Sequence, residues 1–334
     1  MKKERSHLFD ILKGAAIVMV CITHFSWEKP ERTALLFPFW ISMAVPIFML
    51  VTGYLTSASW ERRQLSLREL YSGRVLLPKV KQFLKPFTVM FLAELVLERL
   101  VNRRSVPLEE TVTGYLTGGL GKYGTYYVPV LLQLLLLLPL AYWLIRRDRR
   151  NIAWCFLANF LYEVVKDDLG VTSRSYRLLA VRYLFLVSMG CWLYFARGRF
   201  PAKVYVPMFL LGAGYILLSS YGHVRLPMFR RWYTTCMLTA FYAAPLLALL
   251  LKYGQGLRCA ALEKLGEASY HIFLVQILYY NYGKQLLPMD HRMLNLVTGV
   301  ALCLLTGRLC FLLDRKLSER KKPRLRSSAT EAAA

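Results

Sequence analysis

A histidine and a lysine in the first apolar segment are the residues whose types and spacing point most directly to chemistry. His24 follows Lys13 by eleven residues, within an apolar stretch from Leu8 to Phe25. On a helix, eleven residues leave the two side chains about 20° apart around the axis and about 16 Å apart along it. An ionisable side chain in lipid-facing surroundings costs about 2.5 kcal/mol or more, so it usually has a function there. The pattern predicts a cation near a membrane surface and a reactive imidazole deeper in.

The elements that position these residues are expected to be membrane-spanning helices. Of the 334 residues, 56% are hydrophobic and 19% are charged, and the apolar residues come in long runs. Because about 20 residues are needed to cross a bilayer, the runs predict an all-α integral membrane protein, a bundle of about ten transmembrane helices. The predicted spans are residues 8–25, 35–59, 83–98, 124–145, 151–165, 178–196, 203–221, 233–251, 268–287 and 293–313.

The distribution of charge predicts the orientation of this bundle. The net charge is +24, and Lys and Arg are about twice as frequent in the inner segments as in the outer ones when the N-terminus is placed inside. Both termini are therefore expected in the cytoplasm, with the chain crossing the cell membrane many times. The basic excess fits anionic lipid of the bilayer. No basic stretch is interleaved with exposed aromatic residues, so nucleic acid is not an expected partner.

The chain is expected to form one transmembrane domain over residues 1–320, followed by a basic, disordered tail over residues 321–334. The basic N-terminus leads into an apolar run without a small-residue cleavage site, so the first segment is expected to be a retained helix. Seven cysteines lie scattered without a CxxC pair or clustered histidines. This pattern predicts neither a disulfide framework nor a metal site, and the sequence leaves the oligomeric state open.

Several polar side chains fall in or beside the later spans and predict a wet interior cavity, since unpaired charges facing lipid are not tolerated. Glu163 with Arg182 is expected to shape this cavity; alternatively, Glu163 forms a structural ion pair with Arg177 or Arg182 between neighbouring helices. Gln133 and Gln276 are expected to shape the same cavity or to form interhelical hydrogen bonds.

A second group of cations precedes the third span. Lys79, Lys81 and Lys85 lie within seven residues of one another. The excess of cations on the inner side of membrane proteins accounts for such residues. Alternatively, lysines at the entrance of a helix hold phosphate as point charges. Because Lys13 is expected on the same side of the membrane, these lysines together could hold a phosphorylated donor while His24 acts deeper in.

The first two spans carry a pattern that extends this interpretation. Asp10, Lys13 and His24 are followed by a Val-Pro-Ile-Phe segment and a Gly-Tyr pair; the residues concerned are Asp10, Lys13, His24, Val45, Pro46, Phe48, Gly53 and Tyr54. This pattern resembles the opening of the acyltransferase 3 family of membrane acyltransferases, which typically has Asp, then Arg, ten intervening residues and His. Residues 123–133, 176–185 and 266–276 also resemble segments of many members, so the likeness covers nearly the whole chain.

Three departures from the family pattern stand out. Lys13 replaces the usual Arg. Two parallel hydrogen bonds from a guanidinium group to phosphate or carboxylate are thereby replaced by contact with a single ammonium group. The Arg-x-x-Arg pair that many members carry before the third span is replaced by the looser set Lys79, Lys81 and Lys85. Gln276 stands where many members have a His, which removes an ionisable group.

The resemblance implies transfer of an acyl group, most often acetyl from the co-substrate acetyl-CoA, to a hydroxyl of a cell-surface or lipid-linked carbohydrate. Lys13 and the lysine group would meet the donor's phosphates, with Asp10 orienting Lys13 through an i, i+3 contact. Burial disfavours the charged form of an imidazole, so His24 is expected to stay neutral and act as general base. A covalent acyl-imidazole on His24 is the alternative.

Aromatic residues on the outer side could provide platforms for a sugar acceptor. Aromatic belts at membrane interfaces account for such residues equally well. The residues concerned are Trp27, Trp40, Tyr126, Tyr127 and Trp232.

Two other classes of function fit the composition. A ten-helix bundle with buried charge could export or flip a glycan or move a small solute. Transporters often contain helices broken at corresponding places in two halves, and Pro129, Pro139 and Pro245 form no matching pair. The third class is a membrane anchor or subunit without chemistry of its own.

Overall fold

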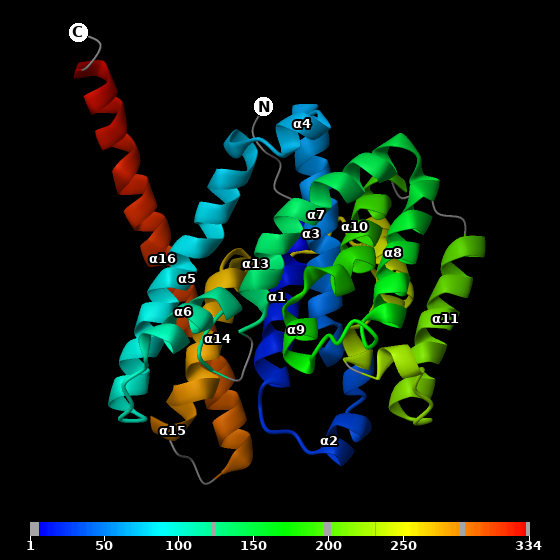
Figure 1. Cartoon of the computed structure of the whole chain (residues 1–334), viewed down its shortest axis with the longest axis horizontal. Helices are drawn as coiled ribbons and strands as arrows, with labels where there is room; N and C mark the ends of the chain where they lie inside the picture. The colour runs from blue at the N-terminus through cyan, green and yellow to red at the C-terminus, as the bar shows by residue number, and fades with distance from the viewer. Residues whose placement is uncertain (1–6, 122–124, 197–201, 231, 287–290, 332–334) are drawn as a thin grey trace.

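Helices make up every regular element of the computed structural model (Figure 1). It describes residues 7–121, 125–196, 202–230, 232–286 and 291–331, and within these ranges there is no strand. The α-helices are α1 (His7–Thr23), α2 (Lys29–Ala34), α3 (Ala44–Arg63), α4 (Leu67–Leu70), α5 (Gly73–Leu100), α6 (Leu108–Thr117), α7 (Tyr127–Arg147), α8 (Ile152–Val165), α9 (Ser173–Leu178), α10 (Leu184–Ala196), α11 (Ala202–Ser220), α12 (Ala240–Tyr253), α13 (Ala260–Glu267), α14 (Ser269–Leu278), α15 (Lys284–Leu286) and α16 (Arg292–Glu331).

Short turns of other helix types extend several of these elements. Turns of 3₁₀-helix precede α3, α10 and α12, among them η2 (Ile41–Met43), η4 (Ala180–Tyr183) and η7 (Met237–Thr239). Another 3₁₀ turn, η6 (Tyr233–Thr235), lies in the connection after α11. Between α14 and α15 the chain forms a turn of π-helix, η8 (Tyr279–Gly283). π-Helical turns are rare and occur frequently at functional sites.

Apolar helices of membrane-spanning length confirm the expected all-helical membrane class. By length and composition, four helical stretches within the described ranges are able to cross a membrane: Phe37–Arg63, Tyr127–Arg147, Ala202–Ser220 and Arg292–Glu319. Ala180–Ala196 and Met237–Tyr253 are shorter apolar stretches. Each predicted span overlaps one or more helices, while the count of ten crossings and the cytoplasmic termini stay predictions. The predicted domain boundary at residue 320 falls within α16 and is likewise untested.

The third predicted span begins earlier in the structure than hydropathy indicated. Helix α5 starts at Gly73, after an N-cap position at Ser72, and both Pro78 and Pro86 lie inside it. A proline removes one backbone hydrogen bond of a helix, but bundles of neighbouring helices tolerate this loss. The lysine group that was expected before a helix entrance therefore lies on α5 itself.

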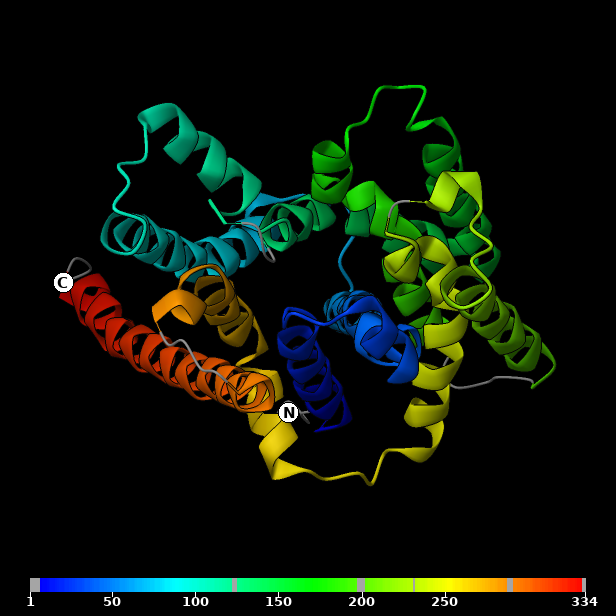
Figure 2. The ribbon, with the colours of Figure 1, turned by 90° about the horizontal axis from the view of Figure 1, so that it is seen from below.

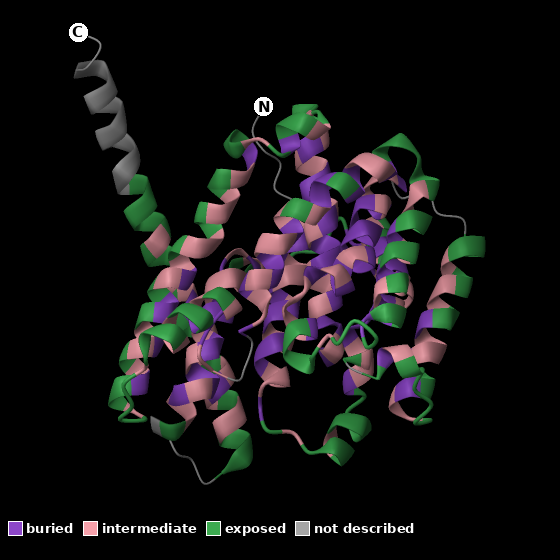
Figure 3. Cartoon of the chain, viewed as in Figure 1, coloured by how far each residue is buried: buried purple, intermediate pink, exposed green. Residues whose placement is uncertain are grey.

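The helices pack around two apolar cores. One core joins α3, α7, α10 and α12, and the other joins α1, α5 and α14. Seen from below, α1 and α3 lie between the group of α5, α6, α14 and α16 on one side and the group of α8 to α12 on the other (Figure 2). Burial is densest along α1, α3, α7 and α10, whereas α11 and α16 carry mostly exposed and intermediate residues (Figure 3).

Two glycines bring α1 and α13 into direct backbone contact. A Cβ atom on Gly14 would lie 2.1 Å from the backbone oxygen of Leu262. A Cβ atom on Gly266 would lie 1.9 Å from the backbone oxygen of Asp10. Since real side chains do not fit at such distances, small residues permit this close approach, as is usual in membrane helix packing. Helix α1 is thereby fixed against α13.

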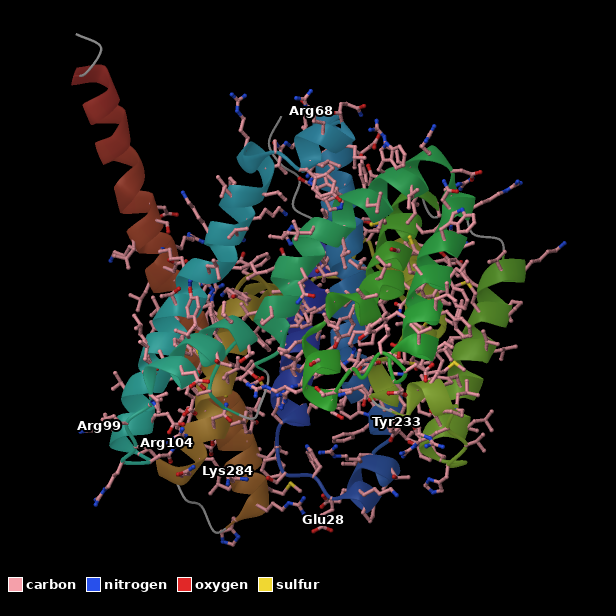
Figure 4. All side chains as sticks on the ribbon, viewed as in Figure 1. Glu28, Arg68, Arg99, Arg104, Tyr233 and Lys284 are labelled. Carbon is pink, nitrogen blue, oxygen red and sulfur yellow. The ribbon has the colours of Figure 1, made fainter. Side chains whose placement is uncertain are left out.

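The bundle has two ends, which we name after the short helices found there. The α4 end carries α4, with Arg68 labelled (Figure 4). The α2 end carries α2 and α15, with Glu28 and Lys284 labelled (Figure 4). Helix α1 runs in the direction from the α4 end toward the α2 end, so Lys13 lies on the α4 side of His24.

Candidate active site

His24 lies directly after the last residue of α1, toward the α2 end of the bundle. Its backbone N–H lies 3.4 Å from the carbonyl oxygen of Val20, which continues the helical pattern by one residue. The imidazole is half-buried, and its ring centroid lies 6.1 Å from that of Tyr280. The residue that the sequence singled out is thus held at a helix terminus, partly screened from solvent and next to an aromatic ring.

Side chains from two other segments satisfy the carbonyl groups at this terminus. The hydroxyl of Tyr280 donates to the carbonyl oxygen of Cys21 at 2.7 Å. The indole N–H of Trp27 donates to the carbonyl oxygen of Ile22, also at 2.7 Å. The last carbonyls of a helix have no partner within it, so these bonds define where α1 ends. They therefore define where the backbone of His24 lies.

The π-helical turn η8 distributes its tyrosines among different helices. Tyr280 contacts α1 as described, whereas the hydroxyl of Tyr282 donates to Glu98 of α5 at 2.8 Å. Tyr279 packs against Gly299 of α16, where a Cβ atom would lie 2.7 Å from its ring. One turn of the chain therefore joins three helices around the terminus that carries His24.

Glu94 is a fully buried carboxylate that sequence reasoning did not assign to a site. It accepts hydrogen bonds from the backbone N–H groups of Leu120 at 3.0 Å and Gly121 at 2.9 Å. The hydroxyl of Tyr282 lies 3.4 Å from the same carboxylate. Glu94 therefore holds the connection between α6 and α7 against α5. No signal in the sequence shows such a contact, because the partners are backbone groups.

Asp10 and Lys13 form an ion pair of 2.8 Å on α1, one turn apart. Asp10 is buried, and a quarter of the Lys13 side chain is exposed. The geometry contains the i, i+3 contact that the spacing predicted. An ammonium group has three donors, so Lys13 keeps hydrogen-bonding capacity beyond this contact.

The other predicted lysines lie along α5. Lys85 forms an ion pair with Asp314 of α16, and its Nζ lies 3.4 Å from the hydroxyl of Ser318. The same Asp314 lies 3.5 Å from Nε2 of His271. Lys81 is exposed and Lys79 is half-buried. The charge of the exposed Lys85 is thus balanced by Asp314, and its predicted role in donor binding stays a prediction.

Glu163 and Arg182 are both fully buried, but a tyrosine links them in place of a direct ion pair. The hydroxyl of Tyr176 lies 2.9 and 3.1 Å from the two carboxylate oxygens of Glu163. The guanidinium carbon of Arg182 lies 4.6 Å from the centre of the Tyr176 ring. The cation nearest to Glu163 is Lys166, at 3.4 Å. Sequence reasoning missed Lys166 because the predicted span ended at residue 165.

The two predicted glutamines differ in their surroundings. Gln133 donates to the carbonyl oxygen of Leu178 at 2.7 Å and accepts from the N–H of Ala180 at 3.1 Å, so it ties α7 to the segment before α10. Gln276 on α14 is fully buried, and neither atom of its amide has a hydrogen-bond partner within the described residues. Gln133 therefore has a structural role, while Gln276 keeps its full hydrogen-bonding capacity.

Two apolar pockets open between the helices. A pocket of about 190 Å³ lies between α1, α3 and α12, and one of about 370 Å³ lies between α11 and α12 with Lys252 at its edge. His24 lines neither of them. Within the described part of the chain, no group of three or more His, Cys, Asp and Glu side chains is placed to hold a metal ion.

The structure is an all-helical membrane bundle, in which an ion pair on the first helix and a histidine directly after that helix follow the order expected for acyltransferase 3 proteins. Residues 7–315 match the family model Acyl_transf_3, described as an acyltransferase domain. The chain therefore belongs to this family, as its sequence motifs predicted. Neither a curated protein nor a solved structure matches the chain.

Proposed function

We propose that this protein transfers an acyl group, most often acetyl, from cytoplasmic acyl-CoA to a hydroxyl of a cell-surface or lipid-linked carbohydrate. One observation carries the proposal: the Asp10–Lys13 pair lies on α1, and His24 follows the last residue of that helix, nearer the α2 end of the bundle. In this proposal the α4 end faces the cytoplasm, where the donor is found. The α2 end faces the acceptor.

The donor's phosphates would bind near the α4 end. Phosphate oxygens are acceptors of charge-assisted hydrogen bonds, for which Lys is a point-charge partner. Lys13 has donors beyond its contact with Asp10. Lys79 and Lys81 on α5 are further candidates, while Lys85 would first have to leave Asp314. The thioester arm of the donor would then extend between the helices toward His24.

His24 would act as general base on the acceptor. The imidazole takes the proton of the acceptor hydroxyl as its oxygen attacks the thioester carbonyl carbon. The new C–O bond forms, the C–S bond breaks, and the thiolate of CoA leaves and takes up a proton. General base catalysis contributes about 10² to 10⁴ in rate. His24 suits this role because it lies directly after the last residue of α1, beside the ring of Tyr280.

The test is binding and slow hydrolysis of labelled acetyl-CoA by the purified protein in detergent. Three proteins are compared: the wild type, His24→Ala and the control His223→Ala, whose histidine is exposed after α11. We expect all three to bind and only His24→Ala to lose turnover. Turnover retained by His24→Ala would contradict the role of His24. A folded wild type that does not bind acetyl-CoA would direct attention to transport.

A further inference from the structure

Arg182 is a fully buried cation enclosed by aromatic rings. Its guanidinium carbon lies 4.6 Å from the ring centres of Tyr176 and Tyr183 and 5.1 Å from that of Trp232. Its Nη2 donates to the hydroxyl of Thr235 at 2.8 Å. Its Nε and Nη1 have no hydrogen-bond partner within the described residues. Two of the three nitrogen atoms of this buried guanidinium group therefore have no hydrogen-bond partner within the described residues.

The charged groups around Arg182 compensate its positive charge only in part. The buried charged neighbours are Glu163 and Lys166, which lie 3.4 Å apart. Asp167 lies 3.7 Å from Lys166, but its side chain is half-exposed. Two buried cations thus share one buried carboxylate. Because a buried charge without full compensation is costly, its presence within a membrane bundle indicates a function.

Trp232 covers the arginine from the surface. Its side chain is 37% exposed, and its ring also packs at 5.5 Å against Tyr126. Its backbone has a φ of +54°, a left-handed conformation that is unfavourable for a bulky residue. Such strain persists where surrounding structure enforces it and is often found at ligand sites. Trp232 is therefore held between solvent and the guanidinium group of Arg182.

The aromatic rings around Arg182 lie toward the same end of the bundle as His24. Tyr233, the neighbour of Trp232, is labelled near the α2 end together with Glu28 (Figure 4). Tyr127, which begins α7, packs its ring at 4.9 Å against Phe273 of α14, the helix that continues into the turn beside His24. The segment from Trp232 to Tyr233 and the residue His24 therefore both lie toward the α2 end of the bundle.

We propose that Arg182, covered by Trp232, binds an anionic group of the acceptor, either the carboxylate of an acidic sugar or a phosphate of a lipid-linked glycan. The guanidinium group provides planar, directional donors that match both anions. The aromatic rings exclude water and provide surfaces for the apolar face of a sugar. This inference rests on the proposed function in treating the ligand as the acceptor, and it assigns acidic glycans as the substrate class.

The experiment measures binding of three probes, glucuronate, glucose 1-phosphate and glucose, by isothermal titration calorimetry to the full chain in phosphatidylcholine nanodiscs. We expect one or both anions to bind about tenfold more tightly than glucose, as a charge-assisted contact allows. The carboxylate and phosphate probes distinguish the two sources of the anion. Arg182→Met should abolish the preference, and Arg182→Lys should reduce it because Lys lacks the planar fork.

The matched control is Arg225→Met. Arg225 lies in the same connection after α11 and stacks on Tyr233 at 4.2 Å, but it is exposed. The preference for anions should persist in this variant. Should Arg182→Met fail to fold, Trp232→Leu serves instead, since it alters a partly exposed ring, and it should weaken anion binding at least threefold.

Two results would overturn the inference: equal binding of all three probes by the wild type, or an unchanged anion preference in Arg182→Met. Hydrolysis of acetyl-CoA is followed in the same samples. A wild type that hydrolyses acetyl-CoA without preferring anions would refute only the Arg182 site. A wild type that binds anions through Arg182 but neither binds nor hydrolyses acetyl-CoA would refute the proposed acyl transfer.

Discussion

The hydroxyl of Tyr280 donates a hydrogen bond to the carbonyl oxygen of Cys21, three residues before His24. This bond comes from a π-helical turn almost at the other end of the chain and closes the last turn of α1. The ring of the same tyrosine lies beside the imidazole. Tyr280 is thereby a positioning residue for His24, since it contacts the helix terminus from which His24 projects.

Tyr280→Phe should lower kcat about tenfold and leave the KM for acetyl-CoA nearly unchanged, because small displacements of a reacting group cost rate more than binding. The substitution keeps the ring and removes one hydrogen bond, which is worth about 1 kcal/mol of stability. Steady-state kinetics on the purified protein measure both constants. Tyr279→Phe is the control, since its hydroxyl makes only a long contact of 3.5 Å with Asn295. A raised KM with an unchanged kcat would refute the positioning role.

Lys13→Glu should weaken acetyl-CoA binding by about tenfold or more, because it places a second negative charge beside Asp10 and removes a phosphate partner. Lys13→Arg should bind at least as well as the wild type, since its guanidinium group can grip phosphate with two hydrogen bonds. Equilibrium binding of labelled acetyl-CoA measures both. If neither variant changes the affinity, the phosphate site lies elsewhere.

Gln276→Leu should raise the midpoint of thermal unfolding, because it removes two buried polar atoms without hydrogen-bond partners. Such atoms cost about 1 to 3 kcal/mol. Gln133→Leu should have the opposite effect, since it leaves the backbone groups of Leu178 and Ala180 unpaired. Thermal unfolding of both variants in one detergent tests the pair. Equal destabilisation by the two substitutions would show that Gln276 has partners in the membrane.

The stabilising effect of Glu31 should depend on pH. Arg292 donates hydrogen bonds to Glu31 and holds the pKa of this carboxyl below its ordinary value. A carboxylate with a lowered pKa stabilises the fold above its unfolded-state pKa, and this contribution is lost as the pH falls through the folded-state pKa. The difference in unfolding midpoint between wild type and Glu31→Gln should therefore be largest near neutral pH and shrink in acid. A constant difference from pH 7 to pH 3 would contradict the ion pair.

Local features of the site could be predicted from the sequence, whereas contacts between distant segments could not. The order of Asp10, Lys13 and His24 along one segment, with His24 directly after the last residue of α1, follows from an apolar run and helical spacing. The hydrogen bond from Tyr280 to Cys21 joins residues 259 positions apart, and no periodic pattern encodes it. Likewise, a buried Tyr176 between Glu163 and Arg182 depends on how α8 and α9 fold against each other.

In the fold, too, local features could be predicted from the sequence better than the rest. Hydropathy located every predicted span on a helix because lipid-facing surfaces are apolar, but it placed the start of α5 ten residues late. The first turns of α5 carry Arg74, Lys79 and Lys81 among apolar residues, so they fall outside an apolar window and hydropathy does not reveal their helical structure. Lys79 and Lys81 were for this reason assigned to a region before a helix that in fact contains them.

The π-helical turn makes the site sensitive to the deletion of one residue within the turn. Substitutions do not test this property. A π-turn accommodates one residue more than an α-turn, so the segment Tyr279–Gly283 contains, in effect, an inserted residue. Deleting Asn281 would let the turn relax to α-helix and change the direction of Tyr282 relative to Tyr280. Its bond to Glu98 would be lost while Tyr280 stayed beside His24. One missing codon would thus separate α5 from the helix terminus that carries the histidine, although every named side chain of the site would still be encoded.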